Sequence, residues 1–239
     1  KTKLTLSGYI SHDQFKLNGD STYRWDTHMG SLRLDHEFSS KFTGALMAGY
    51  GDYSYEVFDE NPNSGFELKY KITYPTVKAD FNLKLEKHKI AFGVHGVYYD
   101  FNPGTFSPSS PQSDKKFIQM EKQYSIESGV YVSDQFQLLN KLHLDAGLRL
   151  SMFQAVGPGS VNIYKSGVPR ETLNLIDTVQ YGKGETIKAY HNLEPRMGLC
   201  YEINPQSSIK MGYNRIYRCL DLVTNTPAVT PVDSWQPSG

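Results

Sequence analysis

Residues 190–218 alternate between apolar and polar side chains in two arms, and this alternation constrains the fold more than any other feature of the chain. A period of two is that of a β-strand, whose successive side chains point to opposite faces. Residues 204–207 (Asn-Pro-Gln-Ser) separate the arms and have the composition of a tight turn. The segment is therefore predicted to be a β-hairpin with one apolar and one polar face. Its apolar positions are Leu193, Met197, Leu199, Tyr201 and Ile203 in the first arm, and Ile209, Met211, Tyr213 and Tyr217 in the second.

The same alternation recurs along the chain and predicts about nine strands in all. In residues 66–85 the apolar positions change parity at Tyr74-Pro75, which predicts a β-bulge there. Residues 102–117 and 157–188 are predicted to be long loops, and the chain from Asp221 onward a polar tail. The seven predicted strands that precede the hairpin cover residues 2–15, 22–38, 42–57, 66–85, 90–98, 124–138 and 142–151.

The lengths of the strands and loops favour a membrane barrel. Most predicted strands reach about 14–20 residues, whereas a globular strand has about 5–6 and a membrane-spanning strand about 9–11. Tight turns near 39–41, 86–87, 139–141 and 204–207 alternate with long connections near 58–65, 102–118 and 156–188. The Asn18-Gly19 turn is the exception: its place in the order puts it among the long connections, but it is short. The predicted fold class is all-β: an antiparallel transmembrane β-barrel, partial in this chain, with short periplasmic turns and long extracellular loops.

Composition agrees with this class and excludes others. The mean hydropathy is −0.50 and no run of about 18 apolar residues occurs, so no transmembrane helix is expected. The 17 Tyr suit the aromatic girdles of a membrane barrel, although a Tyr-rich soluble β-sandwich has a similar composition. Lys+Arg and Asp+Glu both number 25, so no basic field indicates a nucleic-acid partner.

Several segments resemble the barrel of TonB-dependent outer-membrane receptors of the Bacteroidetes type. Each segment is weak alone, but together they follow the expected order over most of the chain. They are 68–81 (LKYKITYPTVKADF), 98–104 (YYDFNPG), 129–136 (GVYVSDQF), 146–153 (AGLRLSMF), 181–196 (YGKGETIKAYHNLEPR) and 208–239 (SIKMGYNRIYRCLDLVTNTPAVTPVDSWQPSG).

This resemblance implies a barrel of about 22 strands with a plug domain inside it, located in the bacterial outer membrane. We read both chain ends as cuts, so residues 1–239 are expected to be part of one barrel domain, with the plug and the remaining strands outside this chain. The implied function is active import of a scarce nutrient. The implied partners are membrane lipid or LPS, the TonB complex through the plug region, the nutrient ligand and a surface lipoprotein. The alternatives are a passive porin, a surface-binding barrel without a plug, and, third, an enzyme.

Candidate site residues follow from alternation and from position near loop ends. Glu194 and Arg196 are predicted to point into the lumen as a polar pair. The residues predicted to contact a ligand on the extracellular side are Tyr53, Tyr55, Tyr99, Asp100 and Trp235, since aromatic faces beside carboxylates suit a sugar or a chelate.

No catalytic, cofactor or metal site is predicted. The seven His lack close metal-ligand spacing, and no nucleophile motif such as Gly-x-Ser-x-Gly occurs, so an enzyme is not expected. In the predicted hairpin Cys200 lies opposite roughly residue 211, which leaves Cys219 about 26 Å further along. A disulfide needs Cα atoms within about 7 Å, so Cys200 and Cys219 are predicted to be free thiols.

Overall fold

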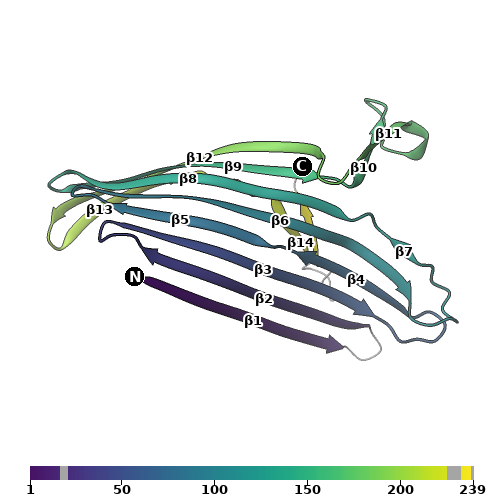
Figure 1. The fold of residues 1–239 in the computed structure, drawn as a ribbon. Coiled ribbons are helices and arrows are strands. Elements are labelled where there is room, and N and C mark those ends of the chain that lie inside the picture. Colours follow the sequence, from purple (N-terminus) through teal and green to yellow (C-terminus); the bar gives the residue numbers. More distant parts are fainter. Residues whose placement is uncertain (17–20, 225–232, 238–239) are drawn as a thin grey trace.

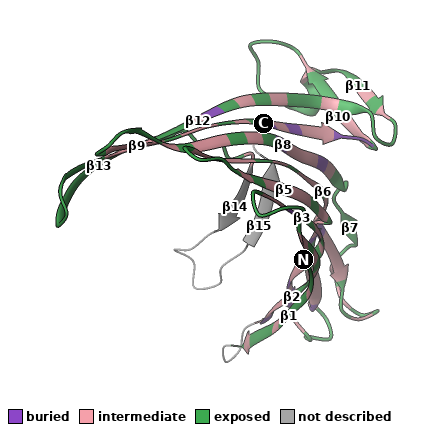
Figure 2. Ribbon diagram, turned by 60° about the vertical axis from the view of Figure 1, so that its left-hand side comes forward, coloured by how far each residue is buried: buried purple, intermediate pink, exposed green. Residues whose placement is uncertain are grey.

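The computed structural model describes residues 1–16, 21–224 and 233–237, and nearly all of its regular structure is antiparallel β-sheet (Figure 1). One curved sheet dominates the chain, as the turned view in Figure 2 shows. The described residues hold one short 3-10 turn, Thr172–Asn174, and no helix with the length and apolar character needed to cross a membrane.

The main sheet confirms the predicted nine-strand meander. Its path is β1-β2-β3-β4-β6-β8-β9-β12-β13, and β5 continues the line of β4 between β3 and β6. The strands are β1 (Thr2–Lys16), β2 (Thr22–Glu37), β3 (Phe42–Phe58), β4 (Phe66–Thr73), β5 (Thr76–Lys84), β6 (His88–Pro108), β7 (Ile118–Gln119), β8 (Gln123–Leu139), β9 (Leu142–Val156), β12 (Thr186–Asn204) and β13 (Ser207–Asn214).

The predicted bulge at Tyr74-Pro75 is wrong. Asp52 pairs with Thr73 and Gly49 with Thr76, so the register with β3 runs through Pro75 without a shift. Pro75 interrupts the strand only because it has no N–H to donate. The parity change has another cause: in β4 the apolar residues occupy one face of the sheet, and in β5 they occupy the other. The register shift lies instead between β4 and β6, at Lys69/Lys71.

Three predicted irregular segments contain strands. β6 extends to Pro108, well into the predicted loop 102–117. The predicted loop 157–188 holds a separate hairpin of β10 (Gly159–Tyr164) and β11 (Leu175–Tyr181). The predicted polar tail holds β14 (Leu220–Thr224) paired with β15 (Asp233–Pro237). The Asn18-Gly19 turn lies outside the described residues.

The outer face of the sheet is apolar and exposed. We define it by the parity of Leu46, whose row of cross-strand partners continues through Ala79, Val94, Val130 and Leu150. Leu6 is 81% and Val130 51% exposed, which is unusual for large apolar residues on a folded chain. A whole sheet face of this kind is what a lipid-facing barrel wall requires.

Aromatic rings border this apolar band at both ends. Near the tight turns Phe38, Phe42, Phe81 and Phe92 form a continuous series of stacked rings with centroids 5.0–5.9 Å apart. Near the long loops Tyr98 stacks on Tyr124 at 6.3 Å, and Tyr50 lies on the same face. Phe42 and Tyr50 are eight residues apart on β3, or about 26 Å along the strand. At a strand tilt near 40° this is about 20 Å along the barrel axis, close to the height of about 25 Å of the apolar band of an outer-membrane barrel.

The inner face, which we define by the parity of His95, Glu127, Arg149 and Glu194, carries most of the buried side chains. Its centre is polar, whereas its loop end over β1–β4 is aromatic. There Tyr23, Tyr55 and Val57 form a buried cluster, against which Phe15, Trp25, Tyr53 and Tyr70 pack with other partly buried residues. We call this cluster the aromatic wall.

The sheet does not close on itself. Within the described residues β1 pairs only with β2, and β13 pairs only with β12, so the first and last strands of the main sheet have free edges.

Candidate functional site: the inner wall

A chain of polar contacts crosses the centre of the inner face from β6 to β12. Tyr99 donates a hydrogen bond to Glu127 (3.3 Å), and His95 lies 3.9 Å from the same carboxylate. Arg149 Nη2 donates to His95 Nε2 (2.9 Å), and its Nε donates to Ser151 Oγ (3.0 Å). Ser151 Oγ in turn donates to Glu194 Oε1 (2.5 Å). Four strands are thereby joined by side chains as well as by backbone.

A second group lies beside it, toward the turns. Tyr131 donates to Asp80 Oδ1 (2.7 Å), and Lys78 forms an ion pair with the other oxygen of that carboxylate (3.0 Å). These residues come from β5 and β8. The sheet therefore has an apolar outer face and hydrogen-bonded charged groups on its inner face. This is the arrangement expected around a water-accessible lumen.

The predicted pair Glu194 and Arg196 shares the inner face, as alternation predicted. Glu194 is buried, at 3% exposure, and its hydrogen bond comes from Ser151 rather than from Arg196. Arg196 is exposed, and among the described contacts it has no ion pair. Sequence reasoning missed Arg149, His95 and Glu127. The alternation already indicated that their side chains point inward, but which of these side chains are in contact depends on the register between β6, β8 and β9.

Replacing Ser151 tests how far this chain stabilises the wall. We expect Ser151→Ala to cost about 1–3 kcal/mol, because the buried carboxylate of Glu194 loses its hydrogen-bond donor. Urea unfolding of the protein in lipid vesicles measures the change. The control is Ser133→Ala on the same face, where the described contacts show no side-chain hydrogen bond. Equal effects at the two sites would contradict the assignment.

The predicted ligand residues divide between the two faces. Tyr53, Tyr55 and Tyr99 lie on the inner face near the loop end. Tyr55 is fully buried between Trp25 (5.4 Å) and Tyr70 (6.0 Å), so it is a packed member of the aromatic wall and has no surface that a ligand could contact. Asp100 lies on the outer face, 3.8 Å from Lys122, and therefore cannot share a surface with Tyr99. Trp235 lies in β15, and its side chain is outside the described part of the structure.

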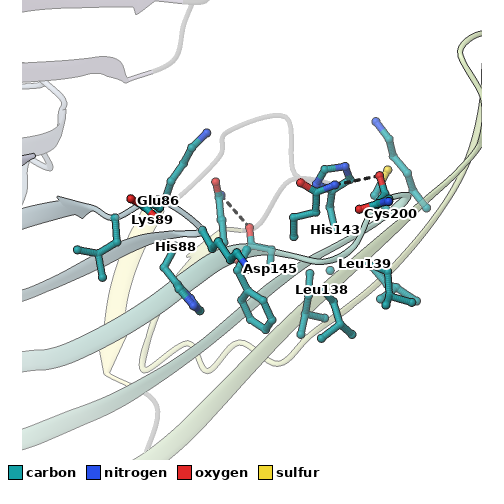
Figure 3. A pocket seen from close by; sticks show the side chains of 18 of the residues that line it. Glu86, His88, Lys89, Leu138, Leu139, His143, Asp145 and Cys200 are labelled. Atoms are coloured by element: carbon teal, nitrogen blue, oxygen red, sulfur yellow. Dashed lines mark hydrogen bonds between the residues drawn. The ribbon is translucent and has the colours of Figure 1, made fainter.

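A hollow of about 770 Å³ lies at the turn end of β6, β8, β9, β12 and β13 (Figure 3). Lys89, His143, Asp145 and Cys200 line it. His143 pairs with Glu202 (3.3 Å), and Gln135 donates to Asp145 (3.0 Å). Apolar residues, Leu138 and Leu139 among them, also line the hollow, and its polar side chains continue the inner wall to its turn end.

Cys200 and Cys219 are free thiols, as predicted, and Cys200 is paired with Lys210, one residue from the predicted position. In the described residues no group of three or more His, Cys, Asp or Glu side chains is arranged to hold a metal ion.

An antiparallel meander of long strands, an apolar exterior bordered by aromatic rings, and a polar interior together define a segment of a bacterial outer-membrane β-barrel. The family comparison agrees. Residues 2–235 match the family described as "TonB dependent receptor-like, beta-barrel", and the chain belongs to that family. No curated protein matches the chain.

Solved structures show the same fold at low identity. The copper transporter OprC aligns with a TM-score of 0.61 and 9% identity, over 85% of this chain and 32% of its own. The ferric-catecholate import receptor Fiu of E. coli K12, in its closed form, aligns at 0.55 and 12%, over 85% and 34%. The siderophore receptor PiuA of Acinetobacter baumannii aligns at 0.53 and 13%, over 92% and 40%. The chain thus spans about a third of the length of these proteins.

Proposed function

We propose that this chain forms part of the barrel wall of a TonB-dependent active transporter that imports a scarce nutrient across the outer membrane. The observation that carries the proposal is the family match over residues 2–235, on a sheet whose outer face is apolar and whose inner face is polar. The whole protein would hold further strands that pair with β1 and β13 and a plug that fills the lumen. We retain the Bacteroidetes-type assignment as a proposal that rests on the sequence segments alone.

Within that transporter the chain binds and guides a ligand and breaks no bond. The long-loop end of the sheet would face the outside and the tight turns the periplasm. Tyr53 and Tyr99 are our proposed ligand contacts, since both present aromatic surface on the inner face near the loops. Arg196, which is exposed on the inner face, would contact the plug or the ligand path, and Glu194 would remain bound to Ser151 within the wall. TonB, acting through the plug, a surface lipoprotein and outer-membrane lipid are the proposed partners.

The test is nutrient uptake by cells that express the whole protein. Cells are supplied with one limiting nutrient at a time: ferric siderophores, copper, haem, vitamins, oligosaccharides and peptides. We expect growth on one class, and we expect that growth to vanish in an otherwise identical strain that lacks TonB. Uptake that persists without TonB would contradict the proposal and favour the passive porin.

A further inference from the structure

β13 leaves the barrel wall partway along β12. β12 pairs with β9 along residues 186–201, whereas it pairs with β13 only along residues 196–204. At the end of this ladder the Arg215 N–H donates to the Pro195 carbonyl (3.2 Å). The N–H and C=O of one residue in an antiparallel ladder face the same neighbour, so Pro195 lacks the donor that would bond back to Arg215. The ladder therefore ends here, and residues 215–224, which we call the strap, leave the wall.

The sequence of the strap does not suit the wall. Odd positions of β13 face outward, as Met211 does opposite an outward residue of β12. Had the strand continued, Arg215 and Asp221 would face lipid, and the apolar Leu220 and Leu222 would face the polar lumen. A charge that faces hydrocarbon near the middle of the bilayer is strongly unfavourable. The chain therefore leaves the wall for a second reason besides the missing N–H.

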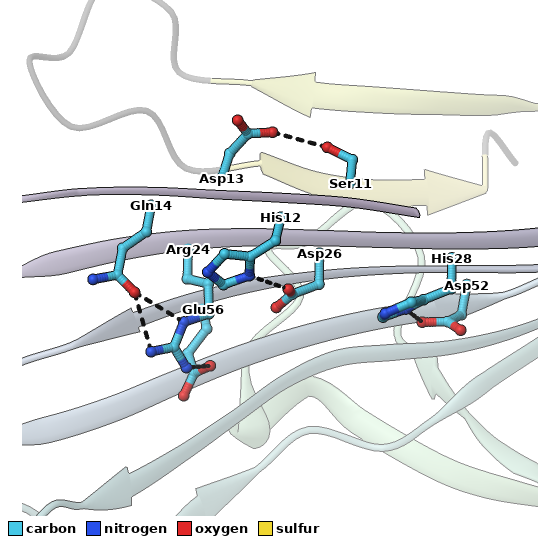
Figure 4. A network of polar contacts seen from close by, with 9 residues as sticks. All are labelled: Ser11, His12, Asp13, Gln14, Arg24, Asp26, His28, Asp52 and Glu56. Atoms are coloured by element: carbon cyan, nitrogen blue, oxygen red, sulfur yellow. Dashed lines mark hydrogen bonds and ion pairs between the residues drawn. The ribbon is translucent and has the colours of Figure 1, made fainter. Parts of the chain in front are cut away.

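The strap reaches β6 across the inner face. Cys219 lies close enough to Tyr99 of β6 for the thiol and the phenol to interact electrostatically, and β15 also lies against β6. β12, β9 and β8 occupy the wall between β13 and β6, so the strap can reach the inward-facing Tyr99 only over the inner face. In Figure 4 the yellow strands β14 and β15 lie on the side of the sheet to which Ser11 and Asp13 point, which is the inner side.

The length of the strap requires a direct path. Along the wall, β13 and β6 are separated by about 19 Å, since neighbouring strands lie about 4.8 Å apart. The chain from Arg215 to Cys219 spans at most about 14 Å when it is fully extended. Because this length is shorter than the path along the wall, the strap runs as a nearly straight chord across the concave side of the sheet, whose curvature Figure 2 shows.

The inner wall near Tyr99 is covered. Phe101, Ser125 and Phe153 face inward at this end of β6, β8 and β9, and they are 2%, 1% and 1% exposed. A single open sheet leaves its inner positions in contact with solvent, so burial of this extent agrees with chain packed over them. Cys219 is itself half-buried. The strap therefore lies on the part of the inner face that the proposed function assigns to the ligand.

We infer that the strap, residues 215–224, closes the ligand path at Tyr99, and that a nutrient must displace the strap from β6 in order to pass. The strap and a nutrient cannot occupy the same surface, so only one of them contacts Tyr99 at a time. A ligand that binds better with the strap displaced shifts the strap away from β6. This inference rests on the proposed function, which places the ligand path along the inner face, and it adds the segment of chain that obstructs that path.

Cross-linking tests the position of the strap. In the whole protein Cys219 is kept as the only native cysteine, and one further cysteine is introduced as Y99C, as S125C on its β8 partner or, as the control, as Y98C on the outer face. A short bis-methanethiosulfonate reagent joins two neighbouring thiols and is removed by reductant. We expect Y99C and S125C, but not Y98C, to be joined to Cys219, as judged by the masses of the joined peptides. Absence of the cross-link in both inner-face variants, or equal cross-linking of Y98C, would overturn the inference.

Uptake by the same cells tests whether the strap obstructs the path. Cells are supplied with ferric siderophores, copper, haem, vitamins, oligosaccharides or peptides. The cross-linked variant, S125C in the first instance because it keeps Tyr99, should lose TonB-dependent uptake in proportion to the fraction cross-linked and should regain it with reductant. The matched control is S54C/K71C without Cys219, which joins β3 to β4 on the outer face and should keep uptake.

Unchanged uptake after cross-linking to the strap, or equal losses in the strap and control variants, would overturn the inference. A wild type without TonB-dependent uptake would instead contradict the proposed function, while the cross-links would still decide where the strap lies.

Discussion

Leu193→Arg is expected to destabilise the barrel by about 2–4 kcal/mol in a bilayer, because it places a charge on the lipid face near the middle of the band. Leu193 is 50% exposed in the isolated chain and lies on the outer face of β12, in the cross-strand row that runs through Leu150, Val130, Val94 and Ala79 to Leu46. In a water-soluble sheet the same change would cost little, since surface substitutions are usually within about 0.5 kcal/mol. The prediction therefore depends on lipid, and not water, covering this face.

An inner-face glycine of the same strand supplies the control. Gly198 lies on the inner face, and a Cβ added there would meet only Asp145 atoms, the nearest at 3.6 Å, which is ordinary contact. Gly198→Arg should therefore unfold at nearly the wild-type urea concentration in the same vesicles. Equal stability of Leu193→Arg and Gly198→Arg would show that the two faces have been assigned wrongly.

Tyr55→Ala is expected to cost about 3–5 kcal/mol, the range for removing a buried aromatic ring. Tyr55 is fully buried in the aromatic wall, between the tilted ring of Trp25 and the stacked ring of Tyr70. Removing its ring leaves a cavity between these two rings at the loop end of β2–β4. Urea unfolding monitored by tryptophan fluorescence reports the change, because Trp25 lies directly against the ring.

Tyr55→Phe separates the ring from its hydroxyl group. This variant keeps both ring contacts and should lose no more than about 1.5 kcal/mol, the net value of an ordinary hydrogen bond. If Tyr55→Ala proved no more harmful than Tyr55→Phe, the aromatic wall would not be a packed core.

Alternation and turn chemistry predicted the nine-strand path of the main sheet and the division of its faces, because successive side chains of a strand point to opposite faces. β8 was predicted from residue 124 to 138 and spans Gln123–Leu139. β6 was predicted much too short, since Asn102, Pro103 and Gly104 have loop composition, yet β6 continues through them with a register shift against β4. Local composition cannot anticipate that a neighbouring strand holds such residues in a sheet.

The inner wall was predicted less well. The parity of Glu194 and Arg196 followed from the sequence, but the partner of Glu194 is Ser151, and this contact depends on the register between β9 and β12. Asp100 was grouped with Tyr99 because the two are adjacent in sequence, whereas adjacency in a strand places them on opposite faces. The aromatic wall was missed for a related reason. At the loop end of β2–β4 the large apolar residues lie on the inner face, whereas in the membrane band they lie on the outer face. Such a change of parity was interpreted as a bulge.

The most direct test of the account is lipid access along β8. Single spin labels are placed at each position from 125 to 132 in the whole protein, with Cys200 and Cys219 replaced by Ser, and the protein is reconstituted in vesicles. Oxygen, which concentrates in hydrocarbon, should relax the labels at Ile126, Ser128, Val130 and Val132 strongly and those at the odd positions weakly. Accessibility to oxygen without a two-residue period, or with its maxima at the odd positions, would contradict an outer-membrane barrel wall with this outer face.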